Sequence, residues 1–536
     1  MGMPYSLASG GAIPAGRNRS ETQAIGRQGA ARRPHVEGKE VLTFVENIEM
    51  SRYSGRSIGE SYDWKLIILY LFLVFIGWAN IYASVHGADV EGIFDFSANS
   101  GKQFIWMLTA FGLGATIIFL VNPNLWEGGA ALFYVMVIGL LVAVIFLGVE
   151  VKGSRSWFAF GPVRFQPAEV SKITTSLLLA FVMSRATFRL TRFKDFLTVA
   201  FIIILPMVII LAEKETGSAL VYVGFIFMLY REGLSGWLLA MIALAILIFI
   251  LTLVASPYTA VLVLIGIISF CSALISRKIW QWLLIYAVGI TTLAFLPHFW
   301  TMLQELKGEE WPFLMNITPF MILLGVSGIA LPLIIWHAMS SKNRVFSLVS
   351  VLTFLCGVGL VLSADVVFNK VLQDHQRKRI EVLLGMKEDP AGVGYNVNQS
   401  MIAIGSGGFA GKGYMNGTQT TYGFVPEQST DFIFCTVGEE WGFVGCLIVI
   451  MLYVLLIMQI IKDAEHSRES FTRIYGYCLA GCLFMHLFIN VGMTIGIMPV
   501  IGIPLPFMSY GGSSLWAFTI MLSIFIALDH REKKYF

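Results

Sequence analysis

The stretch WKLIILYLFLVFIGWANIYASV, residues 64–85, decides the fold of this chain. Its one charged residue is Lys65, and the run is long enough to cross a hydrocarbon core of roughly 30 Å as a helix. Comparable apolar runs of about 17–22 residues recur to the end of the chain, and we count about fourteen. Because they are continuous rather than alternating, they indicate helices and not strands. The sequence predicts an all-α, polytopic membrane bundle. The expected helices centre near Val74, Thr116, Val137, Leu178, Ile204, Gly224, Leu244, Ile267, Ala287, Leu324, Phe354, Val449, Phe484 and Met521.

The composition agrees with this class. Hydrophobic residues make up 56% of the 536 residues and charged residues only 13%, about half the roughly 25% that is usual for soluble domains. The chain has too few charges to cover a soluble protein of this size, which excludes an ordinary soluble enzyme. The small net charge of +3 does not suggest a nucleic-acid partner. The six cysteines are scattered through apolar runs, so we expect no disulfide framework.

The N-terminal residues and the loops predict the orientation. Residues 1–60 are polar and rich in Gly, Ser and Arg, without the apolar core of a signal peptide. We expect them to form a disordered cytoplasmic tail, with Met50 as a candidate for the true start. The short inner loops then carry about fifteen Lys and Arg residues and the short outer loops about six, as the positive-inside rule expects. Both termini are therefore expected in the cytoplasm.

One connection, residues 365–430, is far longer than the others and is expected on the outer face. It begins with DHQRKRIEVLL (374–384), which is typical of an interfacial amphipathic helix. Loops of this length without regular structure are usually functional or disordered. The many apolar and aromatic residues that follow favour function.

Polar groups concentrate in three outward-facing segments, and the first is GSRSWFAFGPVRFQPAEVSK (153–172). Glu169 and Lys172 lie at i and i+3, so they share one face of a helix and can pair. They are interpreted either as a structural ion pair that holds helices together or as a charged wall of a substrate cavity.

The second segment is PEQSTDFIFCTVGEEWGFVG (426–445), where the long outer loop enters an apolar helix. Asp431 at this junction can be a helix N-cap. It can also accept a proton from a hydroxyl nucleophile or bind a divalent cation that holds a diphosphate. We expect Glu427 one helical turn before it.

The third segment is NVGMTIGIMPVIGIPLPFMSYGGSS (490–514), in which Pro499, Pro504 and Pro506 interrupt any helix. Broken backbone at membrane depth is tolerated only inside protein or beside a cavity. We therefore expect a re-entrant loop that faces the same cavity.

These segments closely resemble the signatures of the SEDS family (shape, elongation, division and sporulation). The matching stretches occur in family order and include FQPAEVSK, HQRKRI, DPAGVGYNVNQSMIAIGSGGFAGKGYMNGTQT, FVPEQSTDFIF and GIPLPFMSYGGSS. The GTQT and GIPLPF variants are similar to the RodA branch rather than the division branch.

The resemblance implies a peptidoglycan glycosyltransferase that polymerises lipid II onto glycan held on undecaprenyl pyrophosphate during cell elongation. It implies a class B penicillin-binding protein and other elongation-complex proteins as partners, and a bacterial inner membrane with the active site on the outer side. The essential aspartate of the family falls on Asp431, which is the expected catalytic residue and a candidate ligand for Mg²⁺ or Mn²⁺. Four cationic residues are candidate partners for the diphosphate: Arg155, Lys172, Arg379 and Lys412. Glu169, Gln399, Glu427 and Ser509, which lie in the matched stretches, are also expected to bind substrate.

The chain departs from the family in two places. Where the family commonly has QPDxGTA, this chain has EKETGSA (213–219), which changes the local charge. The family usually has ten spanning helices, so residues 256–344 are interpreted as an insertion of four. Residues 61–255 then form core helices 1–7, and residues 345–536 complete the core.

Three other readings remain open. A lipid II flippase or transporter would also suit a many-helix cavity with buried charges, although we find no internal repeat typical of transporter folds. A division-specific, FtsW-like paralogue and a non-catalytic scaffold are the others.

Overall fold

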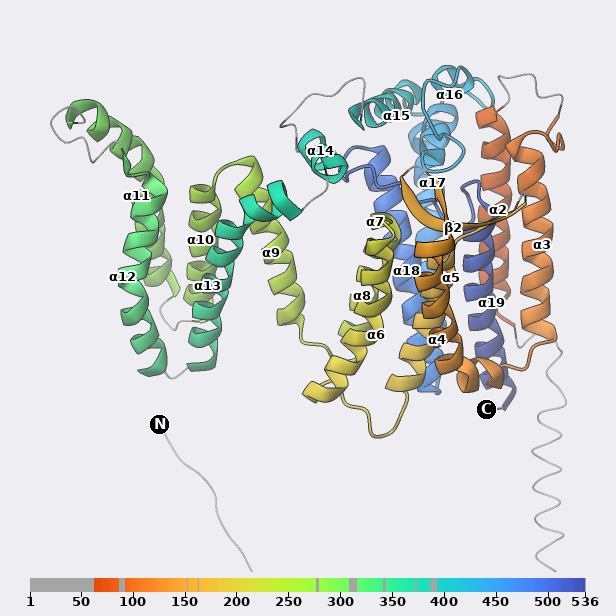
Figure 1. Ribbon diagram of the computed structural model, residues 1–536, viewed down its shortest axis with the longest axis horizontal. Coiled ribbons are helices and arrows are strands. Elements are labelled where there is room, and N and C mark those ends of the chain that lie inside the picture. The colour runs from red at the N-terminus through yellow and green to blue at the C-terminus, as the bar shows by residue number, and fades with distance from the viewer. Residues whose placement is uncertain are drawn as a thin grey trace, which may run out of the picture. The chain divides into compact units, whose positions relative to one another are not determined.

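The computed structural model describes most of the chain from Tyr62 to Tyr535 (Figure 1). The expected tail, residues 1–60, lies outside the described residues. The described ranges are 62–85, 92–151, 153–161, 163–275, 279–307, 316–340, 344–371, 374–384, 386 and 393–535.

The first half of the chain forms helices that are joined by short connections and one small sheet. The helices are α2 (Trp64–Val85), α3 (Asn99–Phe119), α4 (Asn124–Leu147), α5 (Pro167–Met183), α6 (Phe193–Ala212), α7 (Thr216–Val221) and α8 (Phe225–Arg231). A 3₁₀ turn at Tyr222–Gly224 joins α7 to α8. Between α4 and α5, the strands β1 (Val149–Val151), β2 (Ser154–Phe160) and β3 (Val163–Phe165) form an antiparallel meander. This meander was not predicted.

The second half contains the longer helices and the long connection. Its helices are α9 (Gly236–Val254), α10 (Pro257–Ile275), α11 (Ile279–Lys307), α12 (Pro319–Ser340), α13 (Arg344–Val366), α14 (Asp374–Leu383), α15 (Val393–Gly407), α16 (Thr418–Thr421), α17 (Ile433–His466), α18 (Ser470–Thr494) and α19 (Gly512–Tyr535). The amphipathic helix expected at 374–384 is present as α14.

In the described part of the chain, eleven helices are long and apolar enough to cross a membrane. The chain is thus a multi-pass membrane protein, but the expected count of fourteen is not confirmed. Every expected centre except Gly224 falls on an α-helix, and Gly224 lies in the 3₁₀ turn between α7 and α8. Of the helices outside these eleven, α5 has 17 residues, and a 3₁₀ turn interrupts the run from α7 to α8.

The main core surrounds α18. In the apolar stretch of this helix 83% of the residues are buried, whereas in that of α9 only 6% are. Helices α5, α8 and α17 pack against α18. Gly224 and Gly481 let α18 approach the α7–α8 run closely, because a Cβ on Gly224 would lie 2.5 Å from the carbonyl oxygen of Gly481. A helix that is packed on all sides can position polar groups away from lipid.

Helices α9 to α13 form a separate hydrophobic cluster around Val261, Leu264 and Val361. Four inserted helices were expected in residues 256–344, and the described residues of that range form the three helices α10, α11 and α12. The expected boundaries at residues 255/256 and 344/345 divide one packed unit, because α10 packs against both α9 and α13. Hydropathy alone does not tell which neighbours a helix packs against.

Candidate active site

Asp431 lies in the turn that precedes α17, and its side chain is partly exposed. The N-cap of α17 is Phe432, and no side chain caps this helix end. The structure therefore does not support the interpretation of Asp431 as the N-cap. The side-chain amide of Asn490 on α18 donates to the backbone carbonyl of Asp431 over 2.8 Å.

The segment between α18 and α19, residues 495–511, packs against this turn as an irregular loop. The hydroxyl of Ser509 donates to the carbonyl of Thr430 over 2.6 Å, and the amide of Tyr510 donates to the carbonyl of Ser429 over 2.8 Å. A network of this kind satisfies backbone groups that a broken helix leaves without partners. Ser509, a predicted substrate-binding residue, is thus committed to holding the two segments together.

Gly502 brings the same loop directly against the Asp431 carboxylate. Its φ is +74°, in the left-handed region that favours glycine, and a Cβ there would lie 3.2 Å from Oδ2 of Asp431. Both the backbone conformation and the close approach to the carboxylate therefore favour glycine at this position.

Arg379 on α14 interacts electrostatically with both Asp431 and Glu215. Its burial lowers the pKa of the guanidinium, although both carboxylates oppose this shift. Glu215, in the turn between α6 and α7, accepts a hydrogen bond from the side-chain amide of Gln166 over 2.9 Å. Arg379 therefore links the turn before α17 to the turn before α7.

Glu169 and Lys172 form the expected pair, with 2.9 Å between Nζ and Oε2. Both side chains are almost completely buried, with exposures of 4% and 2%. Lys172 Nζ also lies 2.9 Å from Nε2 of His486, and Nδ1 of His486 lies 3.0 Å from the carbonyl of Pro504. Because a carbonyl can only accept, Nδ1 carries the proton and Nε2 accepts from the lysine. The pair therefore also fixes the loop 495–511.

The other predicted residues have different surroundings. Arg155 on β2 lies 3.7 Å from Glu150, and both side chains are more than half exposed. Gln399 lies partly exposed on α15. Glu427 has a φ of +54° in a tight turn and accepts from the Thr430 hydroxyl over 3.0 Å, so it is not one helical turn before Asp431 as expected.

Lys412 forms a short ion pair with Glu439, with 2.6 Å between Nζ and Oε1. Glu439 is completely buried and also accepts from the backbone amides of Gln419 and Thr420, over 2.8 and 2.9 Å. Lys412 thus has a structural partner, and its contact with a diphosphate stays a prediction.

Sequence reasoning missed three members of the site: His486, Asn490 and Gly502. A signal existed for the first two. His486, Asn490 and Thr494 recur every four residues in an apolar run, which places them on one face of a helix. No comparable signal marks Gly502, because its importance depends on the backbone conformation of the loop.

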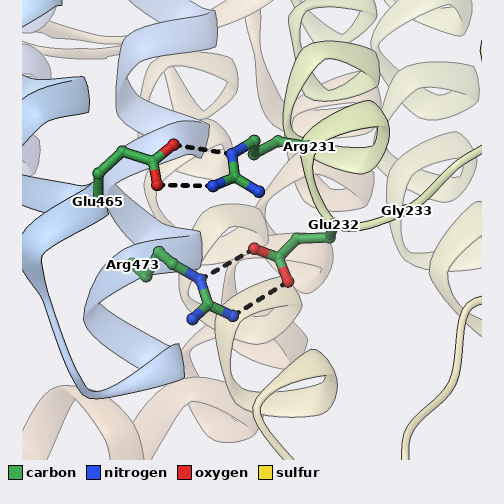
Figure 2. Close-up of a pocket in the computed structure, with 5 residues that line it drawn as sticks. All are labelled: Arg231, Glu232, Gly233, Glu465 and Arg473. Atoms are coloured by element: carbon green, nitrogen blue, oxygen red, sulfur yellow. Dashed lines mark hydrogen bonds and ion pairs between the residues drawn. The ribbon is translucent and has the colours of Figure 1, made fainter.

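A second cluster of charges lies at the opposite end of α17 (Figure 2). It lines a pocket of about 420 Å³. Arg231 binds Glu465 through two hydrogen bonds of 2.7 and 2.6 Å, and Arg473 binds Glu232 through two of 3.1 and 3.2 Å. The four charges compensate one another, so this pocket is a weaker candidate site than the partly exposed Asp431.

The carboxylates near Asp431 are a poor match for a metal site made of protein groups alone. Within the described ranges, no three His, Cys, Asp or Glu side chains come together to hold a metal. Mg²⁺, however, is commonly bound by one or two carboxylates together with substrate phosphates. The donor set therefore fits a cation that Asp431 would share with a substrate diphosphate.

Comparisons with known proteins agree with the motifs. The family described as cell cycle protein, FtsW/RodA/SpoVE, matches residues 63–274 and 265–534. The chain is 30% identical over 475 residues to the peptidoglycan glycosyltransferase RodA of Treponema pallidum (strain Nichols), covering 88% of this chain and 98% of the relative. It is also 30% identical to the peptidoglycan glycosyltransferase MrdB of Escherichia coli (strain K12), covering 77% of this chain and 81% of that protein.

A solved structure shares the fold. This structure is described as "Structural coordination of polymerization and crosslinking by a peptidoglycan synthase complex". Its match to this chain has a TM-score of 0.52 at 24% sequence identity. It covers 88% of this chain and 98% of the solved chain. On the evidence of its motifs, its helices and these relatives, the chain belongs to the FtsW/RodA/SpoVE family.

Proposed function

We propose that this chain polymerises lipid II into glycan strands during cell elongation, with Asp431 at the reacting centre. The chain is a peptidoglycan glycosyltransferase of the RodA type. In the proposed reaction a sugar hydroxyl attacks the anomeric carbon of a lipid-linked glycan. A new glycosidic bond forms, the bond to the diphosphate oxygen breaks, and the polyprenyl diphosphate leaves.

One observation carries this proposal: a partly exposed carboxylate is held by its backbone between a helix start and a glycine-containing loop, within electrostatic reach of a cation. The carbonyl of Asp431 is fixed by Asn490, and its carboxylate faces Gly502 and Arg379. A positioned carboxylate can take the proton from the attacking hydroxyl. The guanidinium of Arg379 can bind the diphosphate through charge-assisted hydrogen bonds.

A divalent cation fits the same arrangement in a different role for Asp431. Such an ion would neutralise the charge that develops on the diphosphate as it leaves. Asp431 would hold it together with substrate oxygens, and we propose Mg²⁺ or Mn²⁺ on this basis. Arg379 would then contact the carboxylate and the diphosphate from the side of α14.

An apolar pocket beside the turn suits the lipid part of the substrates. The pocket has a volume of about 350 Å³ and lies between α15, α17 and α18. Phe434, in the first turn of α17, lines it together with Gly405, Cys446 and Val491. We propose that it takes one segment of a polyprenyl chain, whose diphosphate end would then lie close to Asp431.

We further propose a bacterial inner membrane, with both termini in the cytoplasm and Asp431 on the outer side. The excess of Lys and Arg in the loops on the other side supports this orientation. A class B penicillin-binding protein and other elongation proteins are the proposed partners, because a glycan polymer needs a transpeptidase to be cross-linked.

A lipid II flippase is the second candidate, favoured by the buried Glu169–Lys172 pair, since buried charges also occur along transport paths. Two assays on the purified full chain with its penicillin-binding partner separate the two. The first supplies labelled lipid II and Mg²⁺ and measures glycan polymer. The second measures translocation of lipid II in vesicles. The proposal expects polymer, and translocation without polymer would contradict it in favour of the transporter.

A further inference from the structure

The turn between α6 and α7 holds two carboxylates, Glu213 and Glu215, on either side of Lys214. Lys214 has a φ of +65°, and its side chain is exposed. Glu213 is only 2% exposed. The reaction proposed above makes no use of the Glu213 carboxylate.

Glu213 has no hydrogen-bond partner for either carboxylate oxygen within the described part of the chain. Its backbone groups are bound instead: the amide donates to the carbonyl of Ile209 over 3.0 Å, and the carbonyl accepts from the hydroxyl of Ser154 over 3.0 Å. A buried, ionised carboxylate without partners is costly, because neither a cation nor a donor replaces the water that it loses. A neutral carboxylic acid at this position is far less costly.

The charged groups described around the turn explain why none of their cations compensates Glu213. Glu215 beside it accepts a hydrogen bond from Gln166 and lies within electrostatic reach of Arg379, while burial raises its own pKa. Lys172 on α5 is bound to Glu169. On β2, Arg155 is turned to Glu150. Arg379 interacts with Glu215 and with Asp431, and is therefore shared between them.

We propose that Glu213 is a proton-holding positioning residue, whose neutral form leaves one negative charge in this turn and so keeps Arg379 available to Asp431. Ionisation would place a second negative charge beside Glu215 and draw the guanidinium of Arg379 towards the α6–α7 turn. The proton of Glu213 thereby controls the pairing of Arg379 with Asp431. This inference rests on the proposed function of Asp431.

The electrostatics of the turn agree with this geometry. Burial, followed by the charge of Glu215, raises the pKa of Glu213 to about 8. A group of that pKa is about three-quarters neutral at pH 7.5 and about one-tenth neutral at pH 9. The polymerisation rate of the wild-type enzyme should accordingly fall about eightfold over this range.

The test compares the wild type with Glu213→Gln, because glutamine has the shape of the protonated acid and cannot ionise. The polymerisation rate of Glu213→Gln should equal the wild-type rate at pH 7 and should not show the eightfold alkaline loss. Glu150→Gln, which changes an exposed carboxylate, is the matched control and should keep the wild-type pH profile. Persistence of the full alkaline loss in Glu213→Gln would overturn the coupling to Arg379.

A second readout does not depend on activity. A carboxyl whose pKa is higher in the folded than in the unfolded state contributes stability that is lost as pH rises from about 4.5 to about 8. The melting temperature of Glu213→Gln relative to the wild type should therefore rise between pH 5 and pH 8 and then stay constant. A difference that does not change with pH would show that Glu213 holds no proton and would overturn the proposal.

Two further variants distinguish failure of this inference from failure of the catalytic proposal and from misfolding of Glu213→Gln. The melting experiment in an Asp431→Asn background reads the proton on Glu213 even if the catalytic proposal is wrong. Glu213→Met supplies a second non-ionising side chain, in case glutamine perturbs folding. Both should reproduce the rise in melting temperature relative to their parent between pH 5 and pH 8, and a constant difference in either would count against the inference.

Discussion

Asn490 donates a hydrogen bond from its side-chain amide to the backbone carbonyl of Asp431 over 2.8 Å. The same amide donates to the carbonyl of Ile503 over 2.7 Å. One completely buried side chain on α18 therefore joins the turn that carries Asp431 to the loop 495–511.

Replacing Asn490 with alanine should remove both contacts and leave one partly buried carbonyl and one buried carbonyl without this donor. Each loss costs about 1–3 kcal/mol of folding stability, and displacement of a reacting group by about 1 Å can cost up to about a hundredfold in rate. We expect kcat for lipid II polymerisation to fall at least about tenfold, with KM little changed. Steady-state kinetics check this, and an unchanged kcat in a folded variant would show that the contact does not position Asp431.

Gly502→Ala should impair the enzyme for a different reason. The added methyl group meets the Asp431 carboxylate, and the left-handed backbone costs a non-glycine residue about 1 kcal/mol or more. We expect polymerisation to fall while the melting temperature changes by only a few degrees. Gly423→Ala is the matched control, because Gly423 has a φ of +68° but nothing within 4 Å of its Cβ. Equal activity losses in the two variants would assign the effect to backbone strain alone.

The buried Glu169–Lys172 pair should behave non-additively. Removing one partner leaves an uncompensated buried charge, which typically costs about 3–5 kcal/mol. Glu169→Gln and Lys172→Met should each destabilise the protein strongly, and the double variant should be more stable than either single variant. Thermal unfolding of all four proteins measures this coupling. Additive losses would mean that the two charges do not stabilise each other.

The pair formed by Lys412 and Glu439 should act mainly on structure. Lys412→Met should destabilise the protein and increase hydrogen exchange in residues 411–421, because Glu439 loses its cation. Combining it with Glu439→Gln should restore most of the stability, and the KM of the double variant should stay within about threefold of wild type. A KM raised tenfold or more in the double variant would instead support Lys412 as a diphosphate ligand.

The membrane fold was predictable because the apolar runs are long and continuous. In lipid, a helix forms all the backbone hydrogen bonds of such a run within the segment itself. Each expected centre but Gly224 falls on an α-helix. The grouping of α9 to α13 was not predictable, because hydropathy does not show that α10 packs with α9 and α13. The β1–β3 meander was missed because its strands are only three to seven residues long.

The site was predictable where charge and spacing mark it. The i, i+3 spacing identified the Glu169–Lys172 pair, and the resemblance identified Asp431. The third partner of the pair, His486, is 314 residues from Lys172 along the chain. No local pattern can join residues so far apart, and the same holds for Arg379 between Glu215 and Asp431. The charge of Lys412 marked it as a candidate diphosphate ligand, but no sequence pattern showed that it forms an ion pair with Glu439.

The most direct test of the central claim is the polymerisation rate of Asp431→Asn, measured with the penicillin-binding partner, labelled lipid II and Mg²⁺. Asparagine keeps the backbone contacts and the shape of the side chain, but it cannot accept the proton or neutralise a cation. The account predicts that glycan polymer is reduced by at least about a hundredfold, while the melting temperature stays close to that of wild type. Polymer formed at the wild-type rate by a folded Asp431→Asn protein would contradict it.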